Sequence, residues 1–252
     1  MSKRFVALGD SFTEGVGDED AGRPNGVRGW ADRVADVLGA MDPEFAYANL
    51  AVRGRLLPQV LGEQLDRALE MKPDLVSLYA GGNDLMRPKV DIDALMRRYR
   101  AAVARLVSAG ARVILFTGVD GGDDPVFRKM RGRVAIYNEH VRAIAHDHSC
   151  VLVDMWNMRQ LRDRRMWSAD RLHLNSLGHT EVAISTLEGL GVDHALERTL
   201  LGVAPLQDRR VRRAEDWKWA REHVVPWVMR RVRGESSGDV IRPRRPELLP
   251  PS

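Results

Sequence analysis

Short apolar runs alternate with longer segments of mixed polarity along most of the chain. The runs contain mainly Val, Leu, Ile, Ala and Phe, a composition typical of short strands that are buried on both faces. They lie at residues 5–8, 45–50, 75–79, 113–117 and 151–153. Between the runs, apolar residues recur with the period of about 3.6 residues that indicates amphipathic helices. These helices are expected at residues 31–38, 60–69, 92–107 and 134–145.

This alternation of strand and helix predicts an α/β fold. Buried parallel strands joined by helices need right-handed crossovers, which place helices on both faces of the sheet. We therefore expect a five-stranded parallel sheet inside a three-layer α/β/α sandwich. In open sheets of this kind, reactive groups gather at the carboxyl ends of the strands.

The pattern changes after residue 190, where the strand-like runs stop. An Arg-rich helix with three tryptophans is expected up to residue 233, interrupted at Pro226. Serine, glycine and proline then predict a tail that is extended or poorly ordered. The expected parts are an α/β domain over residues 1–206, a basic Trp-rich helical extension over 207–233 and a Pro-rich tail over 234–252.

The charge of the chain is concentrated in that extension. The 252 residues carry a net charge of +4, but residues 209–245 contain 12 Lys or Arg and 5 Asp or Glu, against 27 and 30 in the rest. A basic helix with tryptophans is compatible with weak binding to an anionic membrane surface or to nucleic acid. The alternative is that it docks on its own core, with the long Arg stems covering apolar surface. The docked arrangement is the one we favour.

The composition excludes several other classes of protein. The 44% hydrophobic and 29% charged fractions are typical of a globular chain with a sizeable core. With Cys150 as the single cysteine, neither an intramolecular disulfide nor a cysteine-rich zinc site can form. No apolar stretch has the length of a membrane span, and the first residues do not resemble a signal peptide. We therefore expect a cytoplasmic protein.

The first strand ends in Gly9, Asp10 and Ser11, which places a hydroxyl at the reactive edge of the sheet. A serine hydroxyl is a poor nucleophile until a base removes its proton and a third group orients that base. His173 supplies the base in our interpretation, because Asp170 precedes it by three residues and can reach the imidazole within one turn of backbone. The three side chains together indicate nucleophilic catalysis.

Two further residues follow the second and third strands. Gly54 can offer an unobstructed backbone N–H, and Asn83 can offer its side-chain amide. Such donors stabilise the oxyanion that forms when a carbonyl is attacked. Three strand ends and one later loop thus each contribute one part of an acyl-transfer site.

In order and spacing, these blocks resemble those of the SGNH or GDSL hydrolases over about residues 4–190. The matching segments are Gly9-Asp10-Ser11 with Gly15, the isolated Gly54, Gly81-Gly82-Asn83-Asp84, and Asp170-x-x-His173. The resemblance implies a flavodoxin-like fold and esterase, lipase, thioesterase, deacetylase or acyltransferase activity. It implies Ser11 as nucleophile, His173 as base, Asp170 as its orienter, and the N–H groups of Ser11 and Gly54 with Asn83 as oxyanion donors. It implies nothing about the extension.

The predicted function is hydrolysis of a small-molecule acyl ester through an acyl-Ser11 intermediate, without cofactor or metal. An acyltransferase using the same site is the alternative, and a binding protein acting through its basic extension is a third hypothesis. An α/β-hydrolase is excluded because its G-x-S-x-G nucleophile motif is absent, position 13 being threonine.

Several neighbouring residues receive more modest roles. Asp10 and Asp84 are expected to accept backbone N–H groups in the turns that aim Ser11 and Asn83, and His179 to be a packing residue. Residues 28–30 and the loop at 120–124 are candidates for lining the pocket. That loop lacks the spacing of a calcium site despite its three aspartates.

Overall fold

Five strands, whose successive side chains point to opposite faces of the sheet, form the centre of the molecule. The computed structural model describes residues 3–122, 124, 127–203, 210, 216–219, 221–222 and 237–251. In β1, Phe5 and Ala7 pack into one apolar layer, whereas Val6 and Leu8 pack into the other. This alternation buries both faces of the strand, as the uninterrupted apolar run predicts. The strands are β1 (Arg4–Gly9), β2 (Ala46–Asn49), β3 (Leu75–Tyr79), β4 (Arg112–Phe116) and β5 (Val151–Val153).

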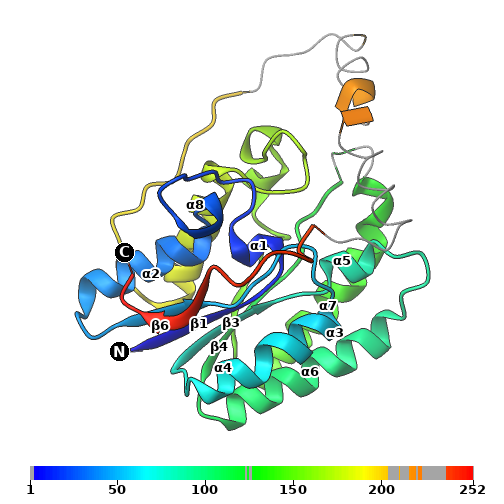
Figure 1. Ribbon diagram of the computed structural model, residues 1–252. Coiled ribbons are helices and arrows are strands. Elements are labelled where there is room, and N and C mark those ends of the chain that lie inside the picture. The colour runs from blue at the N-terminus through cyan, green and yellow to red at the C-terminus, as the bar shows by residue number, and fades with distance from the viewer. Residues whose placement is uncertain are drawn as a thin grey trace.

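Helices cover both faces of this sheet (Figure 1). On one face lie α2 (Trp30–Met41) and α8 (Ser176–Leu190). On the other lie α3 (Leu57–Val60), α4 (Asp66–Glu70), α6 (Ile92–Ser108) and α7 (Arg131–Asp147). A π-helical stretch at Leu61–Leu65 joins α3 to α4, so this helical region is longer than the predicted 60–69. Two single-turn helices, α1 (Ser11–Glu14) and α5 (Gly82–Leu85), follow β1 and β3 directly.

The strand order places β1 inside the sheet, so its carboxyl end lies between the carboxyl ends of β3 and β2. The order is β5-β4-β3-β1-β2-β6, with β1 to β5 parallel. This confirms the predicted parallel α/β/α sandwich with the flavodoxin-like order. From β1 the chain first moves to one side, to β2, and then to the other, to β3. Such a switch point opens a crevice beyond the carboxyl ends of the strands, and Ser11 lies there.

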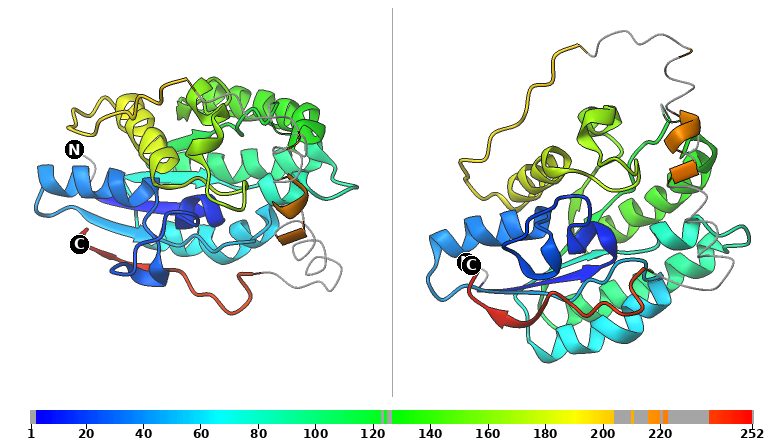
Figure 2. Two further views of the ribbon diagram at one scale, coloured as in Figure 1. Left: turned by 90° about the horizontal axis from the view of Figure 1, so that it is seen from above. Right: turned by 45° about the horizontal axis from the view of Figure 1, so that its top comes forward.

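Within the described residues, the five predicted parallel strands are all present, and one antiparallel strand extends the sheet to six. The sixth, β6 (Arg245–Leu249), comes from the Pro-rich tail and pairs antiparallel with β2, with Tyr47 opposite Leu249 and Asn49 opposite Arg245. Figure 2 shows it along the outer edge of the sheet. Pro246 is compatible with an edge strand, where one missing N–H costs little. The tail has no apolar alternation, and the free edge of β2 supplies the pairing instead.

The predicted helical extension falls largely outside the described residues, including Pro226 and Trp227. Trp217 and Trp219 are described, and they differ: Trp217 is 80% exposed whereas Trp219 is 7% exposed. The part boundaries near 206 and 233 therefore stay predictions. Among the described residues, no helix is both long and apolar enough to cross a membrane.

Candidate active site

The turn after β1 holds Ser11 at the first residue of α1. Gly9 has a φ of +153°, and a Cβ there would lie 2.5 Å from the Tyr79 carbonyl oxygen, so the close approach of β3 requires glycine. The side-chain amide of Gln64 binds both backbone groups of Gly9: its Oε1 accepts from Gly9 N at 2.8 Å and its Nε2 donates to Gly9 O at 2.9 Å. The hydroxyl-bearing residue therefore follows a rigidly held strand end.

Asp170 and His173 form the local pair that the sequence predicts. The distance from His173 Nδ1 to Asp170 Oδ2 is 2.5 Å. The other carboxylate oxygen of Asp170 accepts the backbone N–H groups of Leu172 and His173, each at 3.0 Å, and the Ser168 hydroxyl at 2.6 Å. Burial alone would raise the pKa of Asp170, but the hydrogen bond and charge of His173, with these other donors, hold it well below its usual value. A carboxylate ionised in this way can orient an imidazole that must receive a proton.

The loop after β2 interlocks with the turns after β1 and β3. Arg53 N donates to Glu14 Oε2 at 2.6 Å, and its guanidinium pairs with the same buried carboxylate. On the other side of Gly54, whose φ is +76°, the carbonyl of Arg55 accepts a hydrogen bond from Asn83 Nδ2 at 3.0 Å. Gly54 is thus flanked on both sides by residues tied to α1 or to Asn83.

The two aspartates of the motifs accept backbone N–H groups, Asp10 within its own turn as expected and Asp84 from α3 instead of from the turn of Asn83. Asp10 Oδ1 accepts from Phe12 N at 3.2 Å, and Asp84 Oδ2 accepts from Leu57 N at 2.9 Å. Asp10 Oδ2 also accepts from Asn83 Nδ2 at 3.2 Å. Burial raises the pKa of Asp10 to about 7, because the charged form loses its hydration there.

A cavity of about 280 Å³ brings most of the predicted residues together. Ser11, Asn83 and His173 all line it, whereas Asp170 lies behind His173 and Gly54 is not part of the lining. Most of the wall is apolar, contributed by side chains such as Phe12, Met86, Val119, Phe127, Val134 and Leu172. A concave apolar site with a few convergent polar groups is the usual form of a small-molecule site.

One of the two predicted wall segments lines the cavity and the other does not. Asp120, Gly121 and Asp124 contribute to the wall, and Asp120 is paired with Arg131 at 2.7 Å and with Arg162 at 2.5 Å. Asp123 lies outside the described residues. The expectation for residues 28–30 is wrong, because none of them lines the cavity: Trp30 is fully buried, and Arg28 pairs with Asp36 at 2.7 Å.

His179 packs beneath the nucleophile turn rather than taking part in the cavity. Its Nδ1 accepts a hydrogen bond from Trp30 N at 3.2 Å, and its ring stacks on Phe12 at a centroid distance of 6.2 Å. Burial, with the charge of Arg33, lowers the pKa of His179 to about 3, which keeps the imidazole neutral as an acceptor. This agrees with the packing role expected from the sequence.

Sequence reasoning missed three residues that support the site: Gln64, Trp219 and Arg244. Gln64 holds Gly9, Trp219 donates to the Asp170 carbonyl at 3.0 Å, and Arg244 donates to the Glu14 carbonyl at 3.0 Å. None belongs to a recognisable motif. Each is far in sequence from its partner, so no local pattern indicates the contact.

Comparisons with known proteins identify the family of the chain. A sequence model described as the GDSL-like lipase/acylhydrolase family matches residues 7–180. No curated protein matches the chain.

Several solved structures share the fold. The acetylxylan esterase Axe2 from Geobacillus stearothermophilus has 22% identity and a TM-score of 0.60, covering 76% of this chain and 95% of its own. LAE5, an alpha/beta hydrolase enzyme from the metagenome of Lake Arreo in Spain, has 24% identity and a TM-score of 0.61, covering 75% and 95%. An acetyl xylan esterase, AlAXEase, has 24% identity and a TM-score of 0.60, covering 74% and 99%.

Proposed function

This chain belongs to the GDSL-like lipase/acylhydrolase family and is a hydrolase that acts on esters, and we propose that it does so through an acyl-Ser11 intermediate. The observation that carries the proposal is that Ser11, Asn83 and His173 line one cavity, with His173 held by Asp170 at 2.5 Å. A hydroxyl, a base and an oxyanion donor around one small space are the groups that acyl transfer needs.

In the first half of the proposed reaction, Ser11 Oγ attacks the ester carbonyl while His173 Nε2 takes its proton. Asp170 holds Nδ1, so that Nε2 faces the hydroxyl and the imidazolium is stabilised. The developing oxyanion accepts hydrogen bonds from the N–H of Ser11 and from Asn83 Nδ2, which gives up its hydrogen bond to the Arg55 carbonyl to reach it. The N–H of Gly54, which does not line the cavity, is the third donor that the family resemblance implies. When the tetrahedral intermediate collapses, His173 gives its proton to the departing alcohol, and the acyl group remains on Ser11.

In the second half, a water replaces the alcohol. His173 removes a proton from the water as its oxygen attacks the acyl-Ser11 carbonyl, and the same donors hold the second oxyanion. Collapse releases the carboxylic acid and returns the proton to Ser11 Oγ. The reaction balances with water as the only co-substrate.

The wall of the cavity supports an aliphatic acyl group longer than acetyl. The cavity of about 280 Å³ is close to the lower end of the usual range for small-molecule sites. The apolar side chains of Met86, Val119 and Val134 offer favourable contact to methylene groups. We expect p-nitrophenyl butyrate to octanoate to be hydrolysed with higher kcat/KM than acetate or palmitate.

Replacing Ser11 with Ala tests the proposal. The variant should fold normally and lose about 10³-fold or more in kcat on p-nitrophenyl butyrate, since the nucleophile is gone. His173→Ala should lose a similar factor, because one proton relay needs both residues, and Ser108→Ala serves as a control that removes an exposed hydroxyl at the end of α6, outside the cavity. A Ser11→Ala enzyme with the wild-type rate would overturn the proposal. Measuring acyl transfer to added alcohols in the same assay distinguishes a hydrolase from an acyltransferase.

A further inference from the structure

The C-terminal part of the chain, beyond the family match, contacts three of the four loops that carry proposed active-site residues. This C-terminal segment, defined as residues 216–219 and 237–251, lies outside residues 7–180. It is anchored on the sheet by β6, and Arg67 Nη2 on α4 donates to the Pro246 carbonyl at 2.8 Å. Several of its other polar contacts go to the turns that carry proposed active-site residues.

Trp219 holds the loop of the proposed acid and base. Its indole N–H donates to the carbonyl of Asp170 at 3.0 Å, and the guanidinium of Arg171 lies over its ring at 4.6 Å. Arg171 in turn pairs with Asp216 at 2.5 Å. Arg171 has a left-handed backbone with a φ of 59°, a conformation that a non-glycine residue adopts only when its surroundings support it. The indole and Asp216 provide that support.

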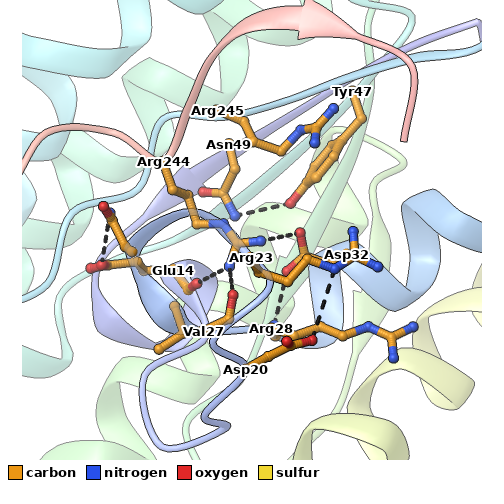
Figure 3. A network of polar contacts seen from close by, with 12 residues as sticks. Glu14, Asp20, Arg23, Val27, Arg28, Asp32, Tyr47, Asn49, Arg244 and Arg245 are labelled. Atoms are coloured by element: carbon orange, nitrogen blue, oxygen red, sulfur yellow. Dashed lines mark hydrogen bonds and ion pairs between the residues drawn. The ribbon is translucent and has the colours of Figure 1, made fainter. Parts of the chain in front are cut away.

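Arg244 holds the turn that carries Ser11. Figure 3 shows its guanidinium between Glu14, Val27 and Asp32. Nη1 donates to the carbonyls of Glu14, at 3.0 Å, and Val27, and Nη2 pairs with the Asp32 carboxylate. The side chain of Arg244 is fully buried, so its charge depends on Asp32 for compensation. Glu14 is the last residue of α1, the four-residue helix that begins at Ser11. The hydrogen bond from Arg244 to the Glu14 carbonyl therefore fixes the position of α1.

The same segment packs on the loop of Gly54. A Cβ on Gly238 would lie 2.0 Å from the Arg53 carbonyl oxygen, so the two backbones are in close contact. Asp239 pairs with Arg55 at 3.5 Å. The residues on both sides of Gly54 are therefore in contact with the C-terminal segment.

We infer that the C-terminal segment is a structural part of the active site, in which Trp219 is a positioning residue for Asp170 and Arg244 one for α1 and Ser11. The inference rests on the proposed function, because it assigns these residues a role only through the proposed catalytic groups. The segment brings no reacting atom; it fixes the groups that do react from the side opposite the cavity.

Trp219→Phe tests the inference, with Trp217→Phe as the matched control. Phenylalanine keeps an aromatic ring but loses the N–H that reaches the Asp170 carbonyl. We expect kcat on a fluorogenic butyrate ester to fall about 3- to 10-fold, the value of one hydrogen bond, with KM and Tm little changed. Trp217→Phe, at an exposed side chain, should keep the wild-type kcat.

A double-mutant cycle shows whether the effect passes through Asp170. In an Asp170→Asn background, Trp219→Phe should cause no further loss, because the oriented carboxylate is already gone. An equal loss in both backgrounds, or equal kcat for the two tryptophan variants, would overturn the role of Trp219. Failure of the proposed function is distinguishable, because it would appear in Ser11→Ala and not in the tryptophan pair.

Gly238→Ala tests the contact with the Gly54 loop independently. The added Cβ must displace the Arg53 carbonyl, so we expect a lower kcat with little change in KM. Gly202→Ala is the control, since a Cβ there meets nothing within 4 Å. A kcat equal to that of the control would contradict the role of the C-terminal segment at this loop.

Discussion

The loops after the parallel strands and the C-terminal segment meet at the same site but contribute differently to it. The loops supply Ser11 and Asn83, which line the cavity, together with short hydrogen bonds to neighbouring turns. The C-terminal segment supplies Trp219 and Arg244, which bind main-chain carbonyls behind those loops and do not line the cavity.

The residues proposed to react and the residues that hold them in place are therefore in different parts of the chain. Reacting groups must face the cavity and remain accessible, so they cannot be fixed by contacts on that side. The supporting groups can be buried, and Trp219 and Arg244 are both largely shielded from solvent. Changes in the loops should therefore reduce turnover with little loss of stability, whereas changes at Arg244 should reduce stability first.

The largest effect on stability is expected at Arg244. Arg244→Ala leaves the Asp32 carboxylate buried and unpaired and two carbonyls without their donor. We expect the free energy of unfolding to fall by about 3–5 kcal/mol, as is typical when one partner of a buried pair is removed. Urea denaturation measures it, with Arg242→Ala as the control, an exposed arginine two residues away. Equal stability of the two variants would show that the buried pair does not hold the segment.

Asn83 should show the opposite behaviour. Asn83→Ala removes a proposed oxyanion donor, and we expect kcat to fall by about 10²- to 10³-fold with KM nearly unchanged. Asn157→Ala, an exposed asparagine outside the cavity, is the control. A loss confined to KM would assign Asn83 to ground-state binding and contradict its role as an oxyanion donor.

A smaller effect, dependent on pH, is expected at Asp10. Its pKa is raised from a reference value of 3.8 to about 7, so between these values the folded protein holds a proton that the unfolded chain has lost. The resulting stabilisation is complete below pH 4 and is lost as the pH rises through about 7.

Asp10→Asn removes this titration. The free energy of unfolding of the wild type should therefore fall relative to that of Asp10→Asn as the pH rises from 4 to 8, by a few kcal/mol at most. Urea denaturation at a series of pH values measures the difference. A difference that stays constant across this range would contradict the raised pKa.

The sequence predicts a candidate site residue where the same short stretch also contains the groups that position that residue. Asp170 and His173 are three residues apart on one turn, and Gly9-Asp10-Ser11 directly follows an apolar run, so both could be predicted. The helix and strand periodicities likewise predicted the parallel sheet and its layers.

The remaining features depend on contacts between distant segments. Arg244 is 230 residues from Glu14 and Trp219 is 49 residues from Asp170. Pro246 and the arginines before it have low strand propensity, but the segment forms a strand because it pairs with the open edge of β2. The ring of Trp30 packs against Phe116 at a centroid distance of 4.6 Å instead of lining the pocket. The helical pattern alone cannot distinguish a core position from a pocket position.

Trapping the acyl-enzyme shows directly whether the acyl group passes through Ser11. The enzyme is mixed with p-nitrophenyl butyrate, quenched in acid within milliseconds and digested, and the peptide carrying the butyryl group is identified by mass spectrometry. The account predicts a butyryl ester on Ser11, reaching at most one per chain, and none in Ser11→Ala. A butyryl group on another residue, or turnover with no acylated Ser11 at any time, would contradict it.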